Sequence, residues 1–211
     1  MVRVSFGYLV IAAGVCGVLS FAFLATALGT DYWYIIQMNQ VNASDADLED
    51  MSSHSGLWSI NEGDKTHADT IDSFKTDYSK FSEAELQMLY MHGAIVVLLP
   101  LSLILLLLGG ICGLVSSLAR SPVLLTGTAA YFFSCSLLTL SGVILYVVYS
   151  HKALVETERL VGQEGLSYIH TSFGWSLALA WLSYSLELLT GVLLLVAAHT
   201  SRLRHSNPTL A

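Results

Sequence analysis

The chain has 211 residues, of which 54% are hydrophobic and 12% are charged, and its mean hydropathy is +0.63. Soluble domains contain roughly 25% charged residues. The composition therefore indicates a membrane protein and argues against a large soluble catalytic domain. The formal net charge is −7, and only three cysteines are present, far apart in the sequence.

Four stretches are long and apolar enough to cross a bilayer, which requires about 20 predominantly apolar residues. They are residues 6–28, 94–118, 122–148 and 173–198. The third stretch begins with Pro122 directly after Ser121, a combination that favours a helix start. The sequence therefore predicts an all-α membrane protein with four transmembrane helices.

The first stretch has a second interpretation as a secretory signal. Arg3, an apolar run and the small residues Ala25-Thr26-Ala27 are similar to such a signal and its cleavage site. The apolar run is longer than the roughly 7 to 15 residues of a signal core. We therefore expect this segment to be retained as the first transmembrane helix.

The distribution of charge predicts the orientation. Four arginines and no acidic residue occur in three segments, residues 1–5, 119–121 and 199–211. The positive-inside rule places these segments, and so both termini, in the cytoplasm. Loops 29–92 and 149–172 would then be extracellular, with net charges of −9 and −1. The glycosylation sequon that begins at Asn42 lies in the first loop, in agreement with this orientation.

No cluster of residues in the sequence suggests catalysis or metal binding. Cys16, Cys112 and Cys135 all fall within the predicted spans, so we expect no disulfide in the extracellular loops. His54, His67 and His92 lack the close spacing of a metal motif and are interpreted as ordinary loop histidines. We expect no enzyme activity, no cofactor, no small-molecule substrate and no nucleic-acid partner.

The first loop is long and aromatic enough to fold. Residues 32–38 and 56–60 have the composition of strands. A capping box from Ser82 to Glu85 predicts a short helix that runs toward the second span. In the second loop, residues 152–161 could extend the third helix, and residues 166–171 have strand character. The predicted fold is a membrane all-α four-helix bundle with a small extracellular antiparallel β-sheet built from both loops.

Several sequence blocks carry a resemblance to a known family. They are Asp31-Tyr32-Trp33-Tyr34-Ile35, Ser55-Gly56-Leu57-Trp58, Leu99-Pro100-Leu101-Ser102-Leu103 and Ser172-Phe173-Gly174-Trp175. With four spans and two unequal loops, this pattern resembles the claudin-like superfamily, which contains claudins, peripheral myelin protein, epithelial membrane proteins and calcium-channel gamma subunits. The resemblance covers nearly the whole chain and implies the claudin-like fold.

The chain departs from that family at one position. The family motif has a cysteine three residues after the tryptophan of the Gly-Leu-Trp element, which forms a disulfide with a second cysteine nearby. Here the position is Asn61, and no cysteine follows until Cys112. Such a short loop closure is worth roughly 2 to 3 kcal/mol, so other contacts must replace it. By analogy with the family, we expect Trp33 and Trp58 to pack the sheet against the helices.

Glu187 is the one ionisable residue inside a predicted span. Such residues are costly and often functional. A hydrogen-bonded carboxyl group facing serines of other helices, with Ser20, Ser102 and Ser141 as candidates, fits better than an ion pathway, because the other spans offer no further ionisable group.

Small residues also mark the first two spans, with Gly14 and Gly17 in one and Gly109 and Gly113 in the other. They suit close helix contacts, either within the molecule or between molecules.

Two functions remain from these observations. The first is an adaptor or auxiliary subunit that binds a larger membrane protein, of calcium-channel or glutamate-receptor type, and modulates its trafficking or gating. The second is a claudin-type cell–cell adhesion or junction protein that binds itself. A glycan at Asn42 would obstruct close apposition of cells, which favours the adaptor. A transporter is disfavoured because one carboxyl group makes no pathway.

Overall fold

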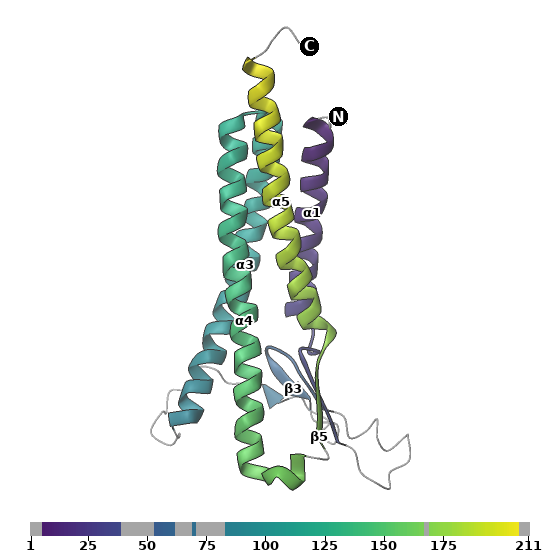
Figure 1. Cartoon of the computed structure of the whole chain (residues 1–211), viewed down its shortest axis with the longest axis vertical. Coiled ribbons are helices and arrows are strands. Elements are labelled where there is room, and N and C mark those ends of the chain that lie inside the picture. Colours follow the sequence, from purple (N-terminus) through teal and green to yellow (C-terminus); the bar gives the residue numbers. More distant parts are fainter. Residues whose placement is uncertain (1–5, 39–52, 62–68, 71–82, 167–168, 207–211) are drawn as a thin grey trace. The chain divides into compact units, whose positions relative to one another are not determined.

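The computed structural model describes residues 6–38, 53–61, 69–70, 83–166 and 169–206. Four long helices make up most of this part of the chain (Figure 1). They are α1 (Phe6–Leu28), α3 (Glu83–Ala119), α4 (Pro122–Leu166) and α5 (Trp175–Ser206). Each contains a stretch that is long and apolar enough to cross a membrane.

Three of these helices extend beyond the spans read from the sequence, and α5 does so by continuing from residue 198 to Ser206. α3 starts at Glu83, so the helix expected before the second span joins it without a break. Ser82, the expected cap, lies outside the described residues. α4 continues beyond residue 148 to Leu166, since no proline interrupts this polar segment.

The strands form one antiparallel sheet with the order β4-β3-β2-β1-β5. They are β1 (Tyr34–Met38), β2 (Ser53–Ser55), β3 (Ser59–Asn61), β4 (Asp69–Thr70) and β5 (Ile169–Phe173). β1 pairs with β5 over five residues, from Tyr34 opposite Phe173 to Met38 opposite Ile169. Both loops thus contribute strands to one sheet, which confirms the predicted fold class.

The Gly56-Leu57-Trp58 element is not a strand, contrary to the expectation for residues 56–60. It is the turn between β2 and β3, closed by a hydrogen bond from the Gly56 N–H to the Ser59 carbonyl at 2.9 Å. Leu57 is fully buried in this turn. The strand-like composition of residues 56–60 therefore led to a wrong prediction, because it does not reveal the hydrogen bond between Gly56 and Ser59.

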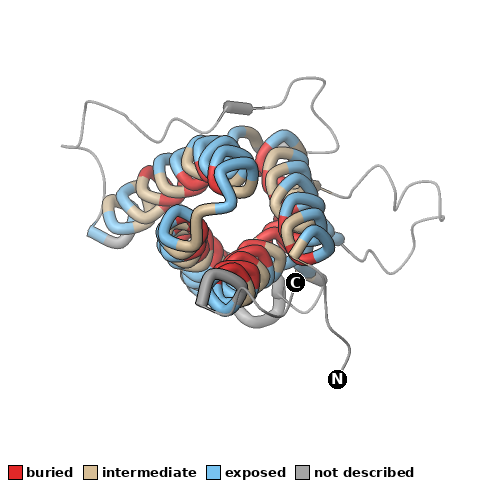
Figure 2. Tube along the Cα trace, turned by 90° about the horizontal axis from the view of Figure 1, so that it is seen from above, coloured by how far each residue is buried: buried red, intermediate tan, exposed pale blue. Residues whose placement is uncertain are grey.

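The chain divides into two compact units, of which the first consists of Met1–Ala25, Pro100–Leu140 and Ala180–Ala211. Segments of all four helices lie side by side in this unit (Figure 1). Buried positions occupy the inner sides of these helices (Figure 2), with Leu24, Leu106, Leu125, Phe132 and Leu194 in its core.

The second unit consists of Thr26–Leu99 and Ser141–Leu179 and contains the sheet. Its core is formed by fully or nearly fully buried side chains, among them Trp33, Leu57, Ile95, Val143 and Tyr146. Trp33 contributes the largest of them.

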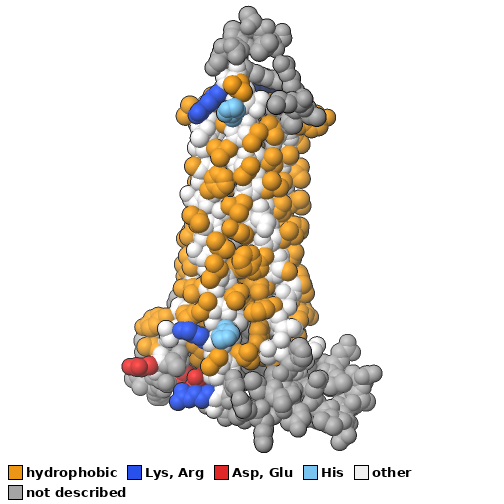
Figure 3. Space-filling model, in the orientation of Figure 1, with side chains coloured by type: hydrophobic (Ala, Val, Ile, Leu, Met, Phe, Trp, Pro, Cys, Tyr) orange, Lys and Arg blue, Asp and Glu red, His pale blue; other side chains and the backbone are white. Residues whose placement is uncertain are grey.

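The outer surface of the helices is apolar. On the face seen in Figure 3, hydrophobic side chains cover the helical surface, and many large ones are exposed, such as Ile11 (67%) and Leu118 (77%). Exposed apolar surface on this scale is unfavourable in water but suits contact with lipid.

Candidate functional site

The end of α1 is capped by side chains from the segment that follows it. The last carbonyl groups of a helix have no partner within the helix. The indole N–H of Trp33 donates to the carbonyl oxygen of Ala27 at 2.7 Å, and that of Trp58 donates to Leu28 at 2.8 Å. The Thr30 hydroxyl group donates back to the last turn at 2.8 Å. We call these three side chains, Thr30, Trp33 and Trp58, the α1 cap.

The two tryptophans of the α1 cap differ in burial. Trp33 has no exposed surface, and its ring packs against Tyr146 with a centroid distance of 4.7 Å. Trp58 keeps 44% of its surface exposed. We expected both rings to pack the sheet against the helices; Trp33 is fully buried, whereas Trp58 is only partly buried.

The start of α5 is bonded to the same segment. The Gly174 N–H donates to the Trp33 carbonyl at 3.0 Å, and the Ser176 N–H donates to the Tyr32 carbonyl at 3.2 Å. The hydroxyl groups of Ser176 and Thr30 are 2.8 Å apart. Unpaired groups at the end of α1 and at the start of α5 are therefore satisfied by one short stretch of chain.

Two glycines allow this close approach. A Cβ atom on Gly174 would overlap the carbonyl oxygen of Tyr32, and one on Gly56 would overlap Asp31. Both contacts involve backbone atoms, which cannot move aside as a flexible side chain can. Close backbone contacts thus explain why glycine occupies positions 56 and 174 in the sequence blocks that carry the family resemblance.

The α1 cap and the sheet hold this region without a disulfide. All three cysteines of the chain are free, in α1, α3 and α4. A hydrogen bond contributes about 1 kcal/mol net, so the two indole bonds together contribute roughly 2 kcal/mol. This is comparable to the contribution of the disulfide that the family motif would supply.

A second cluster lies in the first unit around Glu187, whose side chain has no exposed surface. The hydroxyl group of Thr139 on α4 lies 2.9 Å and 3.1 Å from the two carboxyl oxygens. The hydroxyl group of Ser183, one turn earlier on α5, lies 3.3 Å from Oε1. Thr139 also bonds to Ser102 of α3, and Ser183 bonds to Ser20 of α1. The polar network, Ser20, Ser102, Thr139, Ser183 and Glu187, therefore links all four helices.

The polar network surrounds the Glu187 carboxyl group with hydroxyl groups. Its described interactions are with Thr139 and Ser183, and no cationic side chain is among them. A buried charge without a counterion costs several kcal/mol. The hydroxyl groups of Thr139 and Ser183 donate to the carboxyl oxygens, and the Thr139 hydroxyl group also lies 3.3 Å from the Cys135 carbonyl oxygen. The polar network thus joins the four helices of the first unit.

Sequence reasoning found part of the polar network. Ser20 and Ser102 were named as candidate partners and belong to it, one hydrogen bond removed from the carboxyl group. The direct partners Thr139 and Ser183 were missed. Ser183 could have been found, since residues four apart on a helix share a face.

The glycosylation sequon and the three histidines named from the sequence remain to be placed. Asn42 and His67 lie outside the described residues. His92 is not a loop histidine as expected, because α3 extends over it and buries it against Tyr149 at a ring centroid distance of 5.3 Å. His54 lies in β2, and its ring stacks on that of Tyr32.

The structure is that of a multi-pass membrane protein of claudin-like architecture. It has four apolar helices and one small sheet, and Gly56 and Gly174 allow close backbone contacts near the end of α1. Residues 18–196 match the sequence profile described as PMP-22/EMP/MP20/Claudin tight junction. The chain therefore belongs to this family, which confirms the resemblance drawn from the sequence.

A curated relative in Homo sapiens is the voltage-dependent calcium channel gamma-4 subunit, 30% identical over 189 residues. The aligned region covers 82% of this chain and 56% of that protein. The chain thus spans about half the length of the curated relative it matches.

Proposed function

We propose that this protein is a non-enzymatic auxiliary subunit of the plasma membrane that binds a larger channel or receptor, of calcium-channel or glutamate-receptor type, and modulates its trafficking or gating. The observation that carries the proposal is the similarity to a channel gamma subunit, which extends over 82% of the chain. The polar network supports it, because a carboxyl group occupied by helix-to-helix hydrogen bonds is not organised for transport or catalysis.

The proposed orientation has both termini in the cytoplasm. Within the first unit, the Ser201 hydroxyl group donates to the Arg120 carbonyl at 3.3 Å, so the turn after α3 lies beside the end of α5. Arg120 and Arg202 are both exposed there. Basic residues gathered at one end of a membrane unit support assignment of that end to the cytoplasmic side.

An exposed aromatic surface in the second unit offers a contact for the partner. The ring of Tyr32 stacks on His54 at 4.5 Å and lies 5.9 Å from Trp175. Tyr32 and Trp175 keep 40% and 47% of their surfaces exposed. We call Tyr32, His54 and Trp175 the aromatic stack. Because its rings already support one another, little side-chain freedom is lost on binding, and aromatic residues frequently carry binding energy at interfaces.

The test is proximity labelling in native membranes, with a biotin ligase fused to the C-terminus. We expect recovery of a pore-forming channel or receptor subunit. The double variant Tyr32→Ala with Trp175→Ala should lower that recovery roughly tenfold. Trp181→Ala is the matched control, because Trp181 is exposed to a similar extent (40%) in the other unit.

Two results would contradict the proposal. One is the absence of any channel or receptor subunit from the wild-type sample. The other is crosslinking of two differently tagged copies of this protein across the contact between neighbouring cells, which would establish the adhesion function instead. The proposed topology is tested separately by Asn42→Gln, which should abolish a shift in gel mobility on glycosidase treatment.

A further inference from the structure

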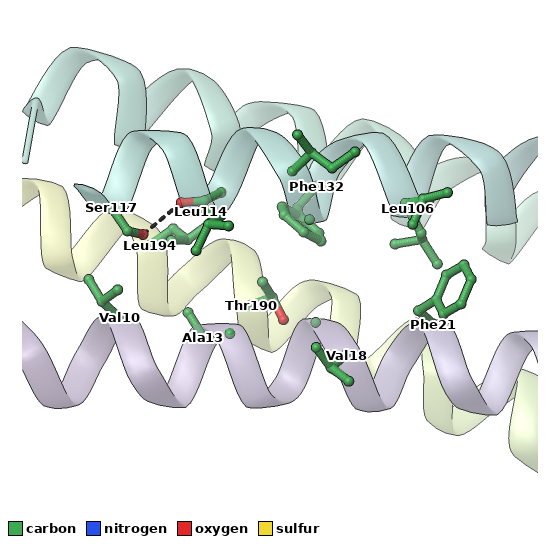
Figure 4. A pocket seen from close by; sticks show the side chains of 16 residues that line it. Val10, Ala13, Val18, Phe21, Leu106, Leu114, Ser117, Phe132, Thr190 and Leu194 are labelled. Atoms are coloured by element: carbon green, nitrogen blue, oxygen red, sulfur yellow. Dashed lines mark hydrogen bonds between the residues drawn. The ribbon is translucent and has the colours of Figure 1, made fainter. Parts of the chain in front are cut away.

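A groove of about 420 Å³ runs between α1 and α3 in the first unit (Figure 4). It is lined from Val10 to Phe21 on α1 and from Leu106 to Ser117 on α3, and side chains of α4 and α5 complete the lining. This volume lies within the range of roughly 300 to 1,000 Å³ that is typical of small-molecule sites.

The groove is wide because four glycines line it. They are Gly14, Gly17, Gly110 and Gly113. A Cβ atom on Gly14 or Gly110 would meet no atom within 4 Å, and the nearest atoms to one on Gly17 or Gly113 lie at 3.8 Å. Packing within the unit therefore does not require glycine at these four positions. Gly109 differs, since its added Cβ would lie 2.9 Å from the ring of Tyr131.

The length of the groove matches one leaflet of a bilayer. Each wall covers eleven helical steps, which correspond to about 16 Å at 1.5 Å per residue. The hydrocarbon core is about 30 Å thick, so one leaflet contributes roughly 15 Å. One end of the groove lies at Val10, four residues after the start of α1, and at Ser117, two residues before the end of α3. From this end, the groove runs toward the middle of the membrane-spanning parts of both helices.

The chemistry of the lining is that of a hydrocarbon site. The hydroxyl groups of Ser117 and Thr190, which also line it, are bonded to carbonyl groups of their own helices at 2.7 Å and 2.8 Å. At the Ser117 end, the exposed Arg120 follows α3, and its N–H donates to the Ser117 carbonyl at 3.3 Å. An apolar groove with a cation beyond one end is complementary to an amphiphile with an anionic head.

We propose that this groove binds one acyl chain of an anionic glycerophospholipid, with the head group beside Arg120. The groove extends over about one leaflet, whereas a partner helix would cross both, so its length favours a lipid chain as the occupant. In the topology proposed above, this is the cytoplasmic leaflet, which holds the anionic lipids.

The test uses the purified full chain in phosphatidylcholine vesicles containing a phosphatidylserine probe with a photoreactive group on its acyl chain. Label is quantified by mass spectrometry on groove residues of α1 and α3. Gly14→Leu with Gly110→Leu fills the groove and should lower this labelling about tenfold relative to wild type. The matched control is Gly7→Leu with Gly127→Leu, two exposed helical glycines that also have open space but lie outside the groove, and it should label as wild type does.

A separate comparison of two lipid probes tests the contact between the head group and Arg120. Arg120→Gln should remove the excess labelling by the phosphatidylserine probe over a phosphatidylcholine probe, while chain labelling persists. Equal labelling of the filled and control variants would overturn the proposal. So would a disulfide between two copies of Gly110→Cys that forms in the membrane and displaces the probe, because a second copy would then occupy the groove. Thermal unfolding verifies that each variant remains folded.

Discussion

Two replacements of Glu187 test whether its hydrogen bonds stabilise the polar network. In Glu187→Gln, the amide oxygen in the place of Oε1 still accepts from Thr139 and Ser183. We therefore expect the free energy of unfolding to change by less than about 0.5 kcal/mol. In Glu187→Leu, both hydroxyl groups lose this acceptor, and a hydrogen bond within a membrane averages about 0.6 kcal/mol.

The expected loss for Glu187→Leu is about 1 kcal/mol, or roughly fivefold in the folding equilibrium. The loss is no larger because both hydroxyl groups keep another acceptor. Ser183 still donates to the Ser20 carbonyl at 2.8 Å, and Thr139 can donate to the Cys135 carbonyl. The assay is reversible unfolding of the purified protein in mixed micelles. Ser185→Ala, on the exposed side of α5, is the control and should have no effect. Equal stability of the Gln and Leu variants would refute the proposed role of the network.

Three further predictions concern the second unit and the cysteines. Trp33→Phe keeps an aromatic ring but removes the hydrogen bond to Ala27, so the free energy of unfolding should fall by about 1 to 3 kcal/mol, measured by chemical denaturation. Gly174→Ala forces a Cβ atom onto a backbone carbonyl and should abolish surface delivery in flow cytometry, whereas Gly127→Ala should not. Reducing agent should leave the thermal midpoint unchanged, because all three cysteines are free; a clear decrease would contradict this.

Much of the fold could be predicted from local features of the sequence. The four spans were recognisable because an apolar run of about 20 residues has few alternatives to a membrane helix. Helix was also predicted before residue 94, from the capping box, and after residue 148, although the sequence did not show that α4 continues to Leu166. The Gly56-Leu57-Trp58 turn was misread as a strand, since its geometry depends on the bond between Gly56 and Ser59.

The candidate sites were less accessible from the sequence. Glu187 stood out as the ionisable residue of the spans, yet its partner Thr139 lies on another helix, 48 residues away. Likewise, the tryptophans were recognised by family resemblance, but that resemblance did not reveal their bonds to the α1 carbonyls. Hydroxyl groups are common in this chain, and only helix packing selects which of them meet.

The sequence by itself determined that this is a membrane protein, how many spans it has, which family it resembles and that its loops lack a cysteine pair. These are properties of composition and short motifs, measured against the thickness of a bilayer. Tertiary structure decided which carbonyl groups are capped, which hydroxyl groups reach Glu187 and which glycines line the groove. Such contacts join residues as far apart as Ser20 and Ser183, separated by 163 positions. Their distances depend on how helices pack, which no local pattern of residues encodes.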